Sequence, residues 1–79
     1  MDKEDLRMML AIGDHFMMMI SETKQGVNLQ KNLESCKIAI KDVDSFISQY
    51  EKGSKDYNAW VDVRKNYHWI MNRILDKMP

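Results

Sequence analysis

The chain has 79 residues, of which 44% are apolar, and its 12 acidic side chains balance its 12 basic ones. That apolar content excludes a disordered tail. The zero net charge argues against a general nucleic-acid-binding protein, because such a protein needs a basic face. The single cysteine excludes an internal disulfide, and no apolar run reaches the ~20 residues of a membrane span. We therefore expect one small domain without a membrane segment, located in the cytoplasm.

Two glycines divide the chain into three segments of helical length. Gly26 and Gly53 each follow a polar stretch, as glycines do where a helix ends in the left-handed conformation. Asn28 and Ser54 are suited to cap the helices that begin after them, and no segment alternates apolar and polar residues as a strand does. The prediction is an all-α single domain over residues 1–79: a three-helix up-down-up bundle with helices at about 2–24, 28–52 and 54–77, the last two forming a long antiparallel hairpin.

Apolar side chains recur at helical spacing along the second and third segments, and each set forms one continuous stripe. In the second segment the stripe comprises Leu29, Leu33, Cys36, Ala39, Ile40, Val43, Phe46, Ile47 and Tyr50. In the third segment it comprises Tyr57, Trp60, Val63, Tyr67, Ile70, Met71, Ile74, Leu75 and Met78. We expect these two stripes to pack against each other across the turn at Gly53.

The first segment is apolar around more than half of its circumference, which is wider than one core stripe requires. Its expected core stripe is Leu6, Met9, Gly13, Phe16 and Ile20; Met8, Ile12 and Met19 widen it on one side, Leu10 and Met17 on the other, and Ala11 and Met18 lie behind. This width favours a contact surface for a second molecule, because methionine adapts to irregular partners and a bare apolar patch promotes aggregation. The alternative is that this helix is simply the most buried one of the bundle.

Trp69 projects from the polar face of the third segment, opposite Trp60. Tryptophan is enriched among the residues that dominate binding energy, so we expect Trp69 to contact a partner. The alternative is that its ring lies flat under the aliphatic stems of charged neighbours. The residues expected to bind a protein partner are Met8, Leu10, Met17, Met18, Met19 and Trp69.

A second candidate site consists of Arg64, Tyr67 and His68, which share one side of the third segment. Arginine, imidazole and phenol groups suit a phosphate or carboxylate, and an aromatic ring suits a nucleobase. The structural alternative, which we favour, is that Arg64 reaches past the core to pair with Asp44 or Glu51.

No residue pattern indicates catalysis, a metal or a cofactor. His15 has no ligand partner four residues on, where a zinc motif would place one. Cys36 lies within an apolar stripe, where a thiol is expected to be buried and inert. We therefore expect no enzyme activity, no metal site and no cofactor.

Three functions remain open. The favoured one is a small non-enzymatic regulator or inhibitor, of the kind common in phages and other mobile elements, that binds a larger protein. The second is an oligomeric protein that binds a small nucleotide-like anion; in either case a homo-oligomer, most simply a dimer, would cover the methionine-rich helix. The third is a DNA-binding regulator, disfavoured by net charge although residues 54–77 hold five Lys or Arg against three Asp.

Overall fold

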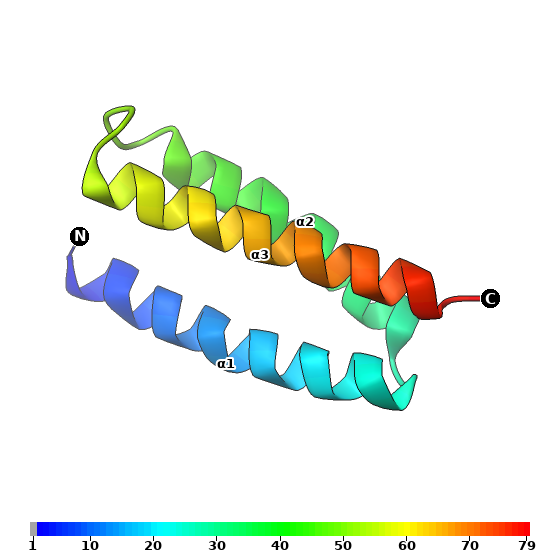
Figure 1. Ribbon diagram of the computed structural model, residues 1–79. Helices are drawn as coiled ribbons and strands as arrows, with labels where there is room; N and C mark the ends of the chain where they lie inside the picture. The colour runs from blue at the N-terminus through cyan, green and yellow to red at the C-terminus, as the bar shows by residue number, and fades with distance from the viewer. Residues whose placement is uncertain (1) are drawn as a thin grey trace.

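The computed structural model describes residues 2–79, which form three helices and no strand. The helices are α1 (Lys3–Gln25), α2 (Leu29–Ile47) and α3 (Lys55–Lys77). α1 runs along the molecule, α2 returns beside it, and α3 runs again in the direction of α1 (Figure 1). The predicted all-α, up-down-up three-helix bundle is confirmed.

The hairpin of α2 and α3 forms most of the core, since these two helices make the closest packing within residues 2–79. The rings of Phe46 and Trp60 stack with their centroids 4.9 Å apart. The apolar stripes of α2 and α3 meet as the sequence predicts, except that Leu75 is 49% exposed and does not belong to the core. The buried apolar residues of the described chain are Met19, Leu33, Cys36, Val43, Ile47, Trp60, Val63, Tyr67, Ile70 and Ile74.

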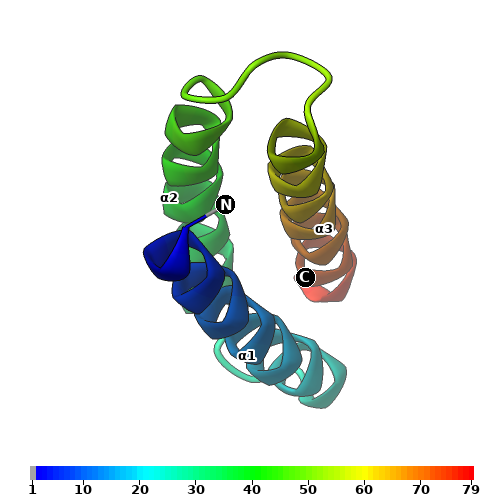
Figure 2. The same ribbon diagram turned by 90° about the vertical axis from the view of Figure 1, so that its left-hand side faces the viewer.

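α1 lies along one side of this hairpin (Figures 1 and 2). Within Lys3–Gln25, only Met19 and Thr23 are buried. Phe16 also attaches α1 to the hairpin, because its ring packs edge-on against the ring of Tyr67 at a centroid distance of 4.5 Å. Leu6 is half exposed, so its place in the predicted core stripe is wrong. The helix is turned so that Met19 and Thr23, rather than Leu6, face the hairpin.

The turn from α1 to α2 is held by one carboxylate. Gly26 ends α1 in the left-handed conformation at φ 73°, as predicted. Asn28 begins α2 but does not cap it with its side chain. Its amide donates instead to Glu22, which also accepts from the buried Asn32 at 3.3 Å. These two amide donors hold the pKa of Glu22 below its usual range.

α2 ends at Ile47 and not near Lys52 as expected. Serine hydroxyls compete with the helical backbone here, because the hydroxyl of Ser48 donates to the carbonyl of Ser45 at 2.7 Å. The released segment places the phenol of Tyr50 against Asp5 at the start of α1, to which it donates a hydrogen bond. Ser54 caps α3, as predicted, because its hydroxyl accepts a hydrogen bond from the backbone N–H of Tyr57.

Candidate functional site

The residues predicted to form one methionine-rich surface lie on different sides of α1. Leu10 is 73% exposed and Met17 is 71% exposed. At about 100° per residue they share one flank, whereas Met8 lies roughly opposite. Met8 lines a groove between α1 and α2 together with Ile12 and other residues. Met18 is exposed and falls between the two flanks. The predicted surface is therefore divided.

Met19 does not belong to any exposed surface, which corrects the prediction for this residue. Its side chain is fully buried, and its sulfur lies 3.7 Å from the thiol of Cys36. The physical reason is the rotation of α1 about its axis: with Phe16 packed on Tyr67, the side chain three positions later also faces the hairpin.

One exposed apolar stripe remains on α1, which we call the outer stripe: Leu6, Leu10, Gly13 and Met17. Its spacing of four, three and four residues is that of a helix–helix seam. Gly13 is half-buried, but beyond its chain neighbours and the backbone of its own helix turn no atom lies within 4 Å of where a side chain would begin, so the middle of the stripe is open. The outer stripe is thus a surface on which another helix could approach closely.

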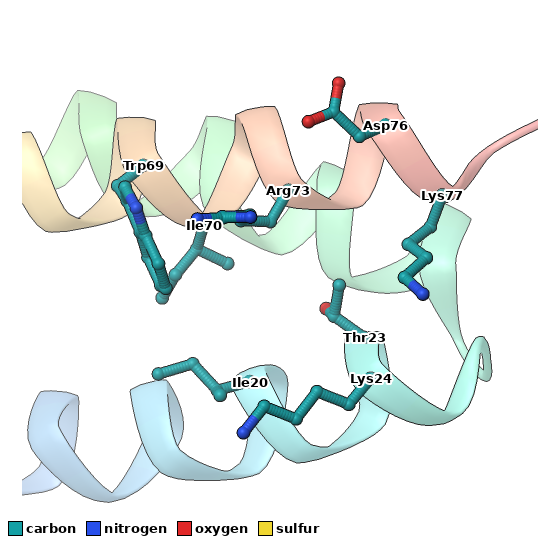
Figure 3. Close-up of a pocket in the computed structure, with 8 residues that line it drawn as sticks. All are labelled: Ile20, Thr23, Lys24, Trp69, Ile70, Arg73, Asp76 and Lys77. Atoms are coloured by element: carbon teal, nitrogen blue, oxygen red, sulfur yellow. The ribbon is translucent and has the colours of Figure 1, made fainter.

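The outer stripe continues into a pocket between the C-terminal halves of α1 and α3. Gly13 and Met17 lie seven residues before Ile20 and Lys24, which line this pocket. Its volume is about 320 Å³, within the ~300–1,000 Å³ typical of small-molecule sites. We call it the indole pocket; it is lined by Ile20, Thr23, Lys24, Trp69, Ile70, Arg73, Asp76 and Lys77 (Figure 3).

Trp69 forms one wall of the indole pocket. It projects from α3 toward α1 and is 48% exposed (Figure 3). The guanidinium of Arg73 lies 5.1 Å from the centre of its ring, a cation–π contact. Trp69 is therefore partly covered by a charged neighbour, as the structural alternative proposed, while much of its surface remains available.

The second predicted site does not form a pocket. Arg64 donates to Asp44 at 2.8 Å, which is the structural pairing favoured from the sequence. Tyr67 is a core residue, only 2% exposed, and its burial raises the pKa of its phenol to about 12. His68 is exposed. Because Tyr67 is buried and Arg64 is paired, the three residues present no joint surface to a ligand.

The chemistry of the remaining candidate groups is that of a folded core. Cys36 is fully buried, and burial raises the pKa of its thiol to about 11, which keeps it protonated near neutral pH. Residues 2–79 contain no group of three potential metal ligands. Along the same stretch, no helix has the length and apolar character needed to cross a bilayer.

Comparisons with protein-family models, curated proteins and solved structures found no match. The site therefore has to be interpreted from its own geometry.

Sequence reasoning missed the pocket residues other than Trp69. One signal was available: Thr23 is a polar residue in line with Phe16 and Met19 on the buried side of α1. A hydroxyl at such a position needs a partner or faces a cavity. The approach of the two helix ends, which places Lys24 and Lys77 in the lining of one pocket, had no signal in the sequence because it depends on how α1 lies on the hairpin.

Proposed function

We propose that this chain is a small non-enzymatic interaction protein, a regulator or inhibitor that acts by occupying a surface on a larger protein. The observation that supports the proposal is the outer stripe, in which three large apolar side chains are at least half exposed on one flank of one helix. Exposed apolar residues are ordinary when scattered, but aligned ones indicate a contact surface.

The outer stripe has the form expected for a helix that binds in a groove or against another helix. Such binding relies on apolar anchors at successive turns of one helix face. Leu10 and Met17 are two turns apart and are the most exposed large apolar residues on α1. Gly13 between them lets a partner backbone approach, and Trp69, which shares a pocket with Ile20 one heptad after Gly13, is available as an aromatic anchor.

A site-specific cross-linking experiment tests this proposal. A photoreactive benzophenone residue is placed at Met17, and in a control at Ile38, which is 63% exposed on α2 and lies outside the stripe. Irradiation is carried out in cells that naturally produce the protein. We expect the Met17 position to form one covalent product with a larger protein and the Ile38 position to form none.

A charge-insertion variant provides the second arm. Leu10→Glu with Met17→Glu is expected to abolish recovery of the cross-linked partner by affinity capture, whereas Ile38→Glu retains it, because only the first places carboxylates in the apolar contact. A product at twice the mass of the chain would assign the stripe to self-association and refute a larger partner. Equal products from both positions would refute a specific surface altogether.

A further inference from the structure

We propose that the indole pocket binds a small planar anion: an aromatic ring that carries a phosphate or a carboxylate. None of the residues that line this site belongs to the outer stripe. The inference rests on the apolar walls of the pocket, on the charges at its rim and on one buried hydroxyl without a partner.

The walls of the pocket suit a flat apolar group. Trp69 reaches across the gap from α3, and Ile20 rises from α1 beneath it, with Ile70 behind (Figure 3). A ligand ring that enters here rests on the two isoleucine side chains and stacks on the indole, where it must displace the guanidinium of Arg73 or share the ring with it, because that group lies 5.1 Å from the ring centroid. Stacking on tryptophan is favourable for any aromatic ring, because each has a π-face.

The rim of the pocket carries three positive charges. Lys24 comes from α1, and Arg73 and Lys77 come from α3. Within residues 2–79 none of the three has a carboxylate within 4 Å. The only acidic residue of the pocket, Asp76, points away from α1, whereas the amine of Lys77 points toward it (Figure 3). With three basic side chains and one acidic side chain, the pocket lining carries a formal net charge of +2.

The interior of the pocket contains a hydroxyl that lacks a hydrogen-bond partner. Thr23 is 6% exposed, and its Oγ1 makes no hydrogen bond. Figure 3 shows this oxygen turned toward the space between Ile20 and Ile70. Native proteins rarely leave such a group unsatisfied. Because this oxygen has less than 1 Å² of accessible surface, a ligand with an acceptor or donor supplies the missing bond only when the side chains around the oxygen move apart.

The position of the pocket also limits which ligands bind. α1 and α3 both end beside it, at Gly26 and Met78, so the helix dipoles present their negative ends. A bare anion is therefore disfavoured at the helix ends and must be held by the lysine and arginine side chains. The stacked ring contributes the remaining affinity, so neither half of the ligand is expected to bind well alone.

The test uses the whole chain, labelled with ¹⁵N, and four probes followed by amide chemical shifts. Adenosine monophosphate supplies a ring with a phosphate, and indole-3-acetate supplies a ring with a carboxylate. Adenosine and inorganic phosphate are the separate halves. We expect at least one of the complete probes to give saturable shifts confined to residues 20–24 and 69–77, and both halves to bind more weakly.

Charge-matched variants decide whether the pocket is responsible. Lys24→Gln with Lys77→Gln is expected to weaken binding at least about tenfold, the effect of losing a charge-assisted contact. Lys41→Gln with Lys65→Gln removes the same charge from exposed positions outside the pocket and is expected to change affinity by less than about twofold. Absence of saturable shifts with both complete probes overturns the proposal, as does equal weakening by the two variants.

Thr23→Val separates a ligand contact from a structural role. Valine has the same shape but no hydroxyl. Because the substitution removes a buried group without a partner, the melting temperature is expected to stay the same or rise, while the affinity for the probe falls. If the melting temperature falls and binding is unchanged, the hydroxyl serves the fold and its assignment to the ligand is wrong.

Discussion

Replacing Met19 by alanine tests how α1 is attached to the hairpin. Met19 is fully buried, and its thioether accepts a weak hydrogen bond from the thiol of Cys36. Truncating a buried methionine costs about 2–5 kcal/mol, the lost transfer energy plus the cavity left behind. A domain of this size has a margin of about 3–5 kcal/mol. Met19→Ala is therefore expected to remove most of the stability.

The matched control is Met17→Ala, because Met17 lies on the same helix but is 71% exposed. Surface substitutions of this kind stay within about 0.5 kcal/mol. Urea denaturation followed by circular dichroism measures both free energies of unfolding, and tryptophan fluorescence reports whether the core opens together with α1. If Met17→Ala costs as much as Met19→Ala, the rotation of α1 described above is wrong.

Three further predictions concern titration and pairing. Burial raises the pKa of Cys36 to about 11, whereas the thiol of the unfolded chain ionises near 9. The free energy of unfolding should therefore fall as the pH rises from 9 to 11, by up to about 1.4 kcal/mol per pH unit. Urea denaturation at several pH values should show a shallower fall for Cys36→Ala. The pKa of Glu22 is lowered, so its contribution is lost as pH falls through the acidic range; thermal melts of Glu22→Gln should lack that component. A double-mutant cycle on Arg64 and Asp44 should give a coupling of about 0.2–1 kcal/mol, since their side chains are 36% and 51% exposed and water screens the pair; a coupling of several kcal/mol would contradict a surface pair.

The helical hairpin was predictable from the sequence because the two apolar stripes that cover each other both belong to this chain. The stripes of α2 and α3 are of ordinary width, and glycines at both turns mark where the helices separate. Phe46 and Trp60 meet as their stripes require. The end of α2 was misplaced because Tyr50 continues the apolar spacing although its phenol hydrogen-bonds to Asp5 from a loop. Spacing alone does not distinguish a helical residue from a loop residue that returns to the same side.

The candidate site was predictable only in part. Trp69, Leu10 and Met17 were identified because an apolar side chain far from the core stripe stands out from its neighbours. The burial of Met19 was not predictable from the sequence. The apolar arc of α1 is wider than the surface that the hairpin can cover, so the sequence does not determine how the helix is rotated about its axis. What fixes that rotation is tertiary: the ring of Phe16 packs on Tyr67 of another helix.

The exposure of the outer stripe follows from this rotation and not from loose packing. Met17 and Met19 are two positions apart, so their side chains point about 160° apart around the helix. Turning α1 to bury Met17 would bring Met19 into water and separate Phe16 from Tyr67. One hairpin can cover only one of the two faces, and the chain places its bulkier aromatic face there. The apolar flank left over stays exposed to solvent, which is the physical premise of the proposed interaction.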